Sequence, residues 1–351
     1  MTDSSHDPPV ASSTQSPDRL AWIDLLRVIA AFLVVLDHCT VIPPHANVEG
    51  SANVWFEPLL KVIAKPAVPI FVMISGALLI RPSLDLGVFL RRRLLRLLPP
   101  FFFGSAIYLI YRIVVFENTI SLLSCLRLIW TGEAYFHLWF FYVLFGVYLA
   151  IPFLSLCWRQ QASERYPLII FFLAIWLAFY SLFPTLAAML ESATEYSFNS
   201  GLSPYVGFFG GFVGYAMMGK YLADRPINTS LAIGMLLAGI SLTTTAVLLA
   251  DRYQIASIAA RGNSPLRILI IVGIYAIAQQ ITFRHAWLSK ISSWTLGIYL
   301  LHPLIIDVSQ RLLGLKLSGV GVIVTALCVF SLSACIVLII SQSRLLRRVM
   351  V

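Results

Sequence analysis

Residues 22–40 read WIDLLRVIAAFLVVLDHCT, a run that is apolar enough to cross a lipid bilayer as one helix. The run nevertheless contains the ionisable side chains Asp24, Arg27, Asp37 and His38. A charge at the centre of a bilayer costs about 2.5–3.5 kcal/mol on insertion scales, so ionisable residues inside a membrane helix are candidates for function. This stretch therefore predicts a membrane helix that carries a functional site.

Helical geometry places three of these side chains on one face. Because an α-helix turns about 100° and rises about 1.5 Å per residue, Arg27 and His38 share a face and lie about 16 Å apart along the axis. Asp24 lies on the same face, one turn before Arg27, whereas Asp37 points about 80–100° away. The prediction is a polar stripe with a guanidinium at one end and an imidazole at the other.

The composition of the chain excludes a soluble globular protein. Of its 351 residues, 59% are hydrophobic and 12% are charged, whereas soluble domains are about 25% charged. The mean hydropathy is +0.86. The net charge of +9 is explained by Lys and Arg that orient membrane helices, so we expect no nucleic-acid partner. The cysteines show no metal-binding spacing, and no metal site is predicted.

Repeated apolar runs predict an all-α polytopic membrane protein, a bundle of about ten transmembrane helices. The expected spans are about 22–42, 59–80, 98–116, 135–154, 167–187, 205–222, 229–250, 265–283, 291–308 and 319–340. Residues 1–18 are rich in Ser and Pro, which predicts a disordered cytoplasmic tail and not a signal peptide. Because the loops are short, residues 19–351 are expected to form a single transmembrane domain.

The distribution of basic residues predicts the topology. Lys and Arg are more frequent in the loops on the side of Arg91–Arg96 than on the other side, so both termini are expected in the cytoplasm. Arg27 then lies toward the cytoplasm. The outer layer is expected to contain His38, Lys61, Lys65 and four candidates for binding an acceptor substrate in a shared cavity: His137, Trp139, Tyr299 and His302.

The segment LRRRLLRLLPP, Leu90 to Pro100, carries Arg91, Arg92, Arg93 and Arg96. Members of this cluster three or four residues apart can share a helix face, and guanidinium groups bind phosphate oxygens in bidentate fashion. The alternative is an orienting anchor that contacts anionic lipid head groups. Composition alone favours the anchor.

The histidines also have simpler explanations. A membrane histidine can hydrogen-bond a neighbouring helix, and His137 lies among aromatic residues that are typical of a membrane interface. Pro303, next to His302, can kink its helix for packing alone. Two ionisable residues on one stripe, Arg27 and His38, favour function over these alternatives.

Four blocks of sequence resemble the membrane acyltransferase-3 family, bacterial integral-membrane acyltransferases that modify surface glycans. The blocks are residues 22–38, 68–79, 89–100, and the pair 137–152 and 293–306. They occur in the family's order. The spacing of Arg27 and His38, together with the arginine cluster, is the most specific part of the resemblance.

The resemblance implies an acyl-CoA donor that is reached from the cytoplasm and a hydroxyl acceptor on a cell-surface or lipid-linked polysaccharide. It implies a multi-pass protein of the bacterial inner membrane that binds no resident cofactor and uses acetyl-CoA as co-substrate. On matching positions it implies that Arg27 and His38 are essential and that Arg93 and Arg96 lie on the donor side. The resemblance therefore favours a role for the arginine cluster in binding the donor over a role as an anchor alone.

The expected mechanism follows from these residues. The phosphates of acetyl-CoA contact the cluster Arg91, Arg92, Arg93 and Arg96. His38 acts as general base on a sugar hydroxyl, and Arg27, with Asp24 fixing its rotamer, holds the donor or stabilises developing charge. An acyl-histidine intermediate is the second variant. Two other functions stay open: a flippase or transporter of a lipid-linked sugar, although no inverted repeat is visible, and a scaffold of a polysaccharide-export complex.

Overall fold

The computed structural model describes residues 18–41, 53–116, 120–194, 204–252, 263–283, 285–313 and 319–350. The predicted tail lies outside these residues, apart from Asp18. Within this part the chain is helical and contains no strand, as predicted. The elements are α1 (Asp18–Val41), α2 (Asn53–Ala64), α3 (Ala67–Leu79), α4 (Leu86–Phe116), α5 (Leu122–Thr131), α6 (Trp139–Cys157), α7 (Ala162–Leu177), a π-helical turn η1 (Ala178–Leu182), α8 (Phe183–Thr194), α9 (Pro204–Asp224), α10 (Thr229–Arg252), α11 (Pro265–Gln279), α12 (Ala286–Leu313), α13 (Val320–Ile340) and α14 (Arg344–Met350).

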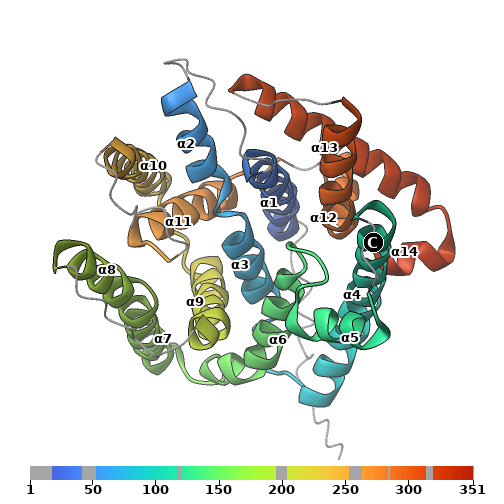
Figure 1. Ribbon diagram of the computed structural model, residues 1–351. Coiled ribbons are helices and arrows are strands. Elements are labelled where there is room, and N and C mark those ends of the chain that lie inside the picture. Colours follow the sequence, from blue (N-terminus) through green and yellow to red (C-terminus); the bar gives the residue numbers. More distant parts are fainter. Residues whose placement is uncertain are drawn as a thin grey trace, which may run out of the picture.

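Helix α1, which contains the polar stripe, lies in the middle of the bundle (Figure 1). It packs against α2, α3, α11, α12 and α13. Its apolar residues Leu26, Ala30 and Val35 are fully buried. Because neighbours surround α1, its charged side chains face protein and not lipid, which lowers the cost of keeping them in a membrane.

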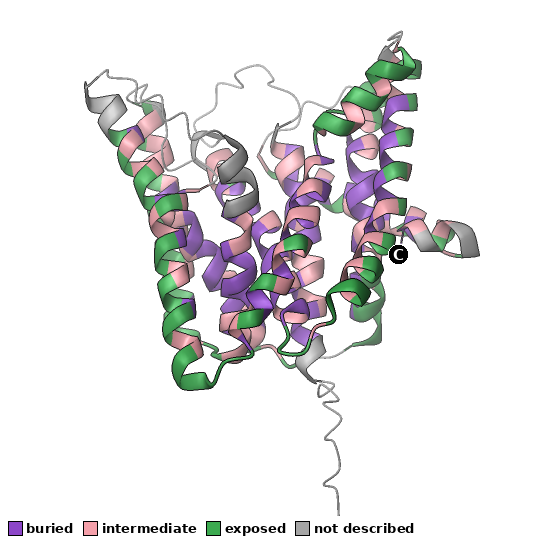
Figure 2. Cartoon of the chain, turned by 90° about the horizontal axis from the view of Figure 1, so that it is seen from below, coloured by how far each residue is buried: buried purple, intermediate pink, exposed green. Residues whose placement is uncertain are grey.

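Seven helices in the described residues are long and apolar enough to cross a membrane. Buried residues gather in the middle of the bundle, whereas the outer helices carry exposed side chains (Figure 2). Many of these exposed side chains are large and apolar, among them Phe102, Phe153, Phe171, Leu237 and Ile339. The chain is therefore a multi-pass membrane protein. The three other expected spans coincide with α1, α9 and α11; their crossing of the membrane, and the cytoplasmic location of both termini, stay predictions.

Two helices differ from the expected spans at prolines. The expected span 59–80 is divided, since α2 ends at Ala64 and α3 begins at Ala67 after Pro66. Helix α4 instead continues through Pro99 and Pro100, so that the arginine cluster and the span 98–116 form one helix of 31 residues. Membrane helices tolerate proline where neighbouring groups satisfy the freed carbonyls. Helices α5 and α14 were not expected.

Glycine allows α3 and α9 to pack backbone against backbone. A Cβ atom on Gly76 would lie 1.9 Å from the carbonyl oxygen of Ala216, and a Cβ atom on Gly219 would lie 2.2 Å from that of Met73. Small residues at such contacts are typical of membrane helix pairs. Ser75 and Gly76 are both small, and Gly76 makes this contact. The contact sets the position of α3, which contributes one wall of the site described below.

The Gly76→Ala variant is expected to lose about 1–3 kcal/mol of stability, or to fail to fold, because the added methyl group meets backbone atoms that cannot move independently. The thermal unfolding midpoint of the purified protein in detergent measures this. Gly234→Ala, on α10, is the matched control, since nothing lies within 4 Å of its added Cβ atom. Equal midpoints for the two variants would show that the α3–α9 contact is not tight.

Candidate active site

A cavity of about 300 Å³, here called the central cavity, lies between α1, α3, α4, α6 and α12. One end carries charged side chains, and the other end is lined by Val34, Phe140 and Tyr299. The volume is at the lower limit for ligand pockets in proteins. We call the charged end, with Arg27, Arg93 and Arg96, the arginine end of the protein, and the opposite end, with His38, His137 and His302, the histidine end.

The arginine end of the central cavity is strongly positive. Its lining contains three guanidinium groups, from Arg27, Arg93 and Arg96, and one carboxylate, from Asp24. The charges of Arg93 and Arg96 both act on Arg27. Like charges held together at a partly buried site repel one another, so an anion that binds between them is favoured. The arrangement suits a ligand with phosphate groups.

Asp24 holds Arg27 in place and ties α1 to α12. Its two carboxylate oxygens accept hydrogen bonds from Ser289 Oγ at 2.6 Å and Ser292 Oγ at 2.7 Å. Arg27 Nη1 lies 3.8 Å from Asp24 Oδ1. Asp24 is thus close enough to attract the Arg27 guanidinium, and its predicted role in fixing the rotamer of Arg27 stays a prediction. The serines were not predicted, although Ser289, Ser292 and Ser293 have the spacing of one helix face.

The arginine cluster divides into two pairs. Arg93 and Arg96, one turn apart on α4, line the central cavity. Arg91 and Arg92 are exposed, and neither is among the lining residues. All four were predicted to contact the donor, and the structure brings only Arg93 and Arg96 to the cavity. Arg92 lies four residues before Arg96 and so shares part of its helix face. The division therefore depends on how α4 is turned toward the cavity and not on helical spacing alone.

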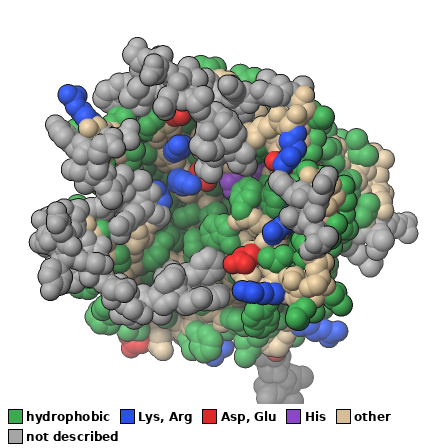
Figure 3. Space-filling view, in the orientation of Figure 1, with side chains coloured by type: hydrophobic (Ala, Val, Ile, Leu, Met, Phe, Trp, Pro, Cys, Tyr) green, Lys and Arg blue, Asp and Glu red, His purple; other side chains and the backbone are tan. Residues whose placement is uncertain are grey.

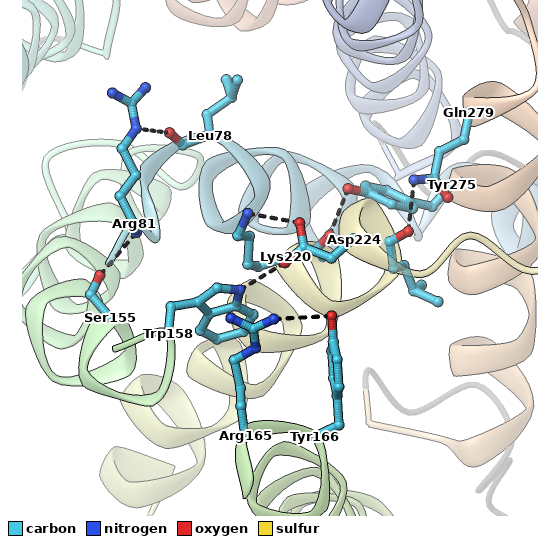
Figure 4. A network of polar contacts seen from close by, with 12 residues as sticks. Leu78, Arg81, Ser155, Trp158, Arg165, Tyr166, Lys220, Asp224, Tyr275 and Gln279 are labelled. Atoms are coloured by element: carbon cyan, nitrogen blue, oxygen red, sulfur yellow. Dashed lines mark hydrogen bonds and ion pairs between the residues drawn. The ribbon is translucent and has the colours of Figure 1, made fainter. Parts of the chain in front are cut away.

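Polar contacts brace the arginine end (Figure 4). Asp224 on α9 accepts hydrogen bonds from Lys220 Nζ at 2.9 Å and from Trp158 Nε1 at 2.7 Å. Ser155 Oγ accepts a bond from the backbone N–H of Arg81, and Arg81 Nε donates to the carbonyl of Leu78 at 3.2 Å. Leu78 lines the central cavity. The contacts of Arg81 fix the end of α3 against α6. They thereby hold one wall of the arginine end of the central cavity.

The structure brings the three predicted histidines together. His38 Nδ1 lies 2.6 Å from His302 Nε2, and the ring centroids of His137 and His302 are 5.8 Å apart. His302 and His137 are 0% and 1% exposed, whereas His38 is half-buried. Of the three, only His38 is therefore open to a substrate. Neither ring nitrogen of the buried His137 has a hydrogen-bond partner in the described part of the chain.

The other residues predicted for the outer layer take different positions. Tyr299 lines the end of the central cavity, and its hydroxyl donates to the backbone carbonyl of His137. The ring of Trp139 packs against Phe140 and Phe212. Tyr299 therefore lies between the cavity and the histidines, while Trp139 belongs to the packing of α6 against α9.

The surface beside His38 carries further charge. Asp37, which points away from the polar stripe, is 3.0 Å from Lys65 Nζ. On the face shown in Figure 3, a histidine side chain is visible in a hollow, with basic and acidic side chains beside it. A polar molecule that approaches the histidine end thus meets both charged groups and an imidazole.

Helix α1 connects the two ends. Val34 lines the central cavity, and His38 follows it by one helical turn, which is about 6 Å along the axis. A ligand that fills the cavity from the arginine end would therefore bring its tip within about one turn of the imidazole. The sequence predicted the polar stripe on α1. The structure adds the cavity that runs along it.

Residues 20–342 match the family Acyl_transf_3, described as an acyltransferase domain. The chain belongs to the acyltransferase-3 family. The match covers nearly the whole chain, including α1, the arginine cluster and His302, and confirms the resemblance noted in the sequence. No curated protein and no solved structure matches the chain. As a member of the acyltransferase-3 family with several membrane-spanning helices, the protein is a membrane acyltransferase.

Proposed function

We propose that this protein transfers a short acyl group, acetyl in the simplest case, from acyl-CoA at the arginine end to a sugar hydroxyl at the histidine end. The observation that carries the proposal is the central cavity, which begins at Arg27, Arg93 and Arg96 and ends one turn of α1 before His38. The acceptor would be a cell-surface or lipid-linked polysaccharide, and the arginine end would face the cytoplasm of a bacterial cell.

The arginine end suits the phosphates of acyl-CoA, because it holds an excess of two positive charges. Beyond the arginines the lining becomes apolar, with Phe71, Ile74 and Leu144. Such a wall suits the arm that carries the acyl group, since burying apolar surface is favourable. The small volume favours a short acyl group over a long one. No resident cofactor is needed for this chemistry.

Arg27 and His38 cannot act on the same atom, because they are about 16 Å apart along α1. Arg27 would therefore hold the donor, with Asp24 and the serines of α12 fixing its position. Stabilising charge at the reacting carbon, the other role considered for Arg27, does not fit this separation.

His38 would act as the general base. Its imidazole takes the proton of the sugar hydroxyl while the hydroxyl oxygen attacks the thioester carbonyl. The new C–O bond forms, the C–S bond breaks, and the proton passes from the imidazole to the departing thiolate of CoA. General acid–base catalysis of this kind contributes about 10²–10⁴-fold to the rate.

The proposal predicts that purified protein in lipid nanodiscs binds acetyl-CoA at least tenfold more tightly than S-acetyl-pantetheine, which lacks the phosphates. Two charge-assisted hydrogen bonds suffice for such a difference, since each contributes about 1.5–3 kcal/mol. Binding is measured at equilibrium with radiolabelled ligands. With a bacterial extract of lipid-linked glycans, label from acetyl-CoA should enter the glycan as a base-labile ester.

A flippase of lipid-linked sugars would show neither the preference for acetyl-CoA nor the transfer of label. Equal affinity for the two thioesters, together with no labelled ester above the level of empty nanodiscs, would refute the acyltransferase mechanism proposed here.

A further inference from the structure

The rings of His38 and His302 meet end to end. Their planes are inclined by only 10°, and their centroids are 4.8 Å apart, while His38 Nδ1 lies 2.6 Å from His302 Nε2. The difference between these two distances is close to the sum of the two ring radii. The bonded nitrogens therefore lie nearly on the line between the ring centres, and the rings are close to coplanar. This is the geometry of an N–H···N hydrogen bond and not of face-to-face stacking.

The direction of this bond follows from the other nitrogen of His302. Nδ1 of His302 lies 3.1 Å from the backbone carbonyl oxygen of Ile298. A carbonyl oxygen can only accept, so Nδ1 must carry the hydrogen. His302 is 0% exposed, where a charged imidazolium is costly, and the neutral ring then has a bare Nε2. That nitrogen accepts a hydrogen bond, which His38 Nδ1–H must donate.

The same reasoning fixes the free nitrogen of His38. A neutral imidazole that carries its hydrogen on Nδ1 has a lone pair on Nε2. His38 is half-buried, whereas His302 is fully buried, so it is the outer ring of the pair that can meet a substrate. The chain of bonds from Ile298 through His302 to His38 thus leaves a basic nitrogen at the open end.

The turn of α12 that carries His302 fixes the orientation of the imidazole ring. Pro303 has no N–H, so the carbonyl one turn before it lacks its usual helical donor. On the same turn, the carbonyl of Ile298 accepts the hydrogen bond from His302 Nδ1. The imidazole is thereby held on its own helix before it contacts α1. Among the described residues, the titratable groups around the pair include the ion-paired Asp37 and Lys65 on one side and His137 and Tyr299 on the other.

We propose that His302 is a positioning residue that holds His38 in the tautomer whose Nε2 is the general base. This inference rests on the proposed function and assigns a role within it. His302 touches neither acyl donor nor acceptor. When Nε2 of His38 takes the hydroxyl proton, Nδ1–H still donates to the neutral His302, and the proton then leaves from Nε2 to the thiolate of CoA. His302 gains and loses no proton in the cycle.

Two substitutions of His302 test the inference. Glutamine can place its amide oxygen near the position of Nε2 and accept the bond from His38, whereas leucine cannot. We expect His302→Leu to lower kcat for acetyl transfer about 10–100-fold, the usual effect of removing a group that orients a metal-ligating histidine, and His302→Gln to restore most of that loss. KM for acetyl-CoA should stay within twofold in both, because His302 does not line the central cavity.

The thermal unfolding midpoint and acetyl-CoA binding establish that each variant is folded. Full activity of folded His302→Leu would overturn the inference. Equal losses in folded His302→Leu and His302→Gln would also overturn it, since imidazole itself would then be required. His38→Asn is measured in parallel: if His38→Asn is inactive and His302→Leu is fully active, only the positioning role fails, whereas absence of transfer by the unaltered protein would refute the proposed function itself.

Discussion

Replacing His38 by asparagine is expected to lower the rate of acetyl transfer by about 10²–10⁴-fold, the usual contribution of a general base. The asparagine amide nitrogen can take the place of Nδ1–H and keep the hydrogen bond to His302, but nothing replaces the lone pair of Nε2. The fold should therefore survive while the chemistry is lost. Transfer of radiolabelled acetyl from acetyl-CoA to glycan measures the rate.

The matched control for this substitution is His285→Asn. His285 is an exposed histidine just before α12 and belongs to neither the central cavity nor the histidine pair. We expect it to keep full activity. Binding of acetyl-CoA should be the same in both variants, because His38 does not line the cavity. If His38→Asn transfers acetyl as fast as His285→Asn, His38 is not the base.

The second large effect is expected from the arginine cluster. The double variant Arg93→Ala/Arg96→Ala should weaken acetyl-CoA binding about 100-fold or more, since each lost charge-assisted hydrogen bond costs about 1.5–3 kcal/mol and about 1.4 kcal/mol corresponds to a factor of ten. Equilibrium binding of radiolabelled acetyl-CoA gives the affinity. The loss should shrink at high salt, because salt screens the interaction.

The double variant Arg91→Ala/Arg92→Ala is the matched control for this loss of affinity. The two double variants remove the same charge from the same helix, and so have the same effect on net charge and on the basic residues that orient α4. They differ in whether the guanidinium groups reach the central cavity. Equal affinities for the two would assign the whole cluster to an orienting role at the lipid head groups.

Much of the fold could be predicted because a long apolar run in a membrane protein folds as a helix that spans the bilayer. Every expected span coincides with helix, and the family match extends over residues 20–342. The breaks were harder to predict. Pro66 separates α2 from α3, whereas Pro99 and Pro100 lie inside α4. A proline always removes one N–H donor. Whether the helix ends there depends on the groups that adjacent helices place around it, and the local sequence does not specify those groups.

The candidate site, too, could be predicted only in part. The stripe of Asp24, Arg27 and His38 could be predicted because all three lie on one helix, whose geometry is fixed. That His302 lies at the same level of the bundle as His38 could be predicted as well. Its contact with His38 could not, since it depends on the packing of α1 against α12 across 264 positions of sequence. Likewise, only the position of α4 against the cavity separates Arg93 and Arg96 from Arg91 and Arg92. The roles of these residues stay predictions.

The mainly apolar layer of Val34, Phe140 and Tyr299 at the end of the central cavity nearest the histidines has an electrical consequence. Moving one elementary charge across a membrane potential takes about 2.3 kcal/mol per 100 mV, and an apolar layer adds the cost of desolvating that charge. A neutral acetyl group would cross it without electrical work, while the phosphates of CoA and the charged parts of a glycan stay on their own sides. Under the proposed function, this layer would therefore let a neutral acyl group pass while opposing the movement of charged groups.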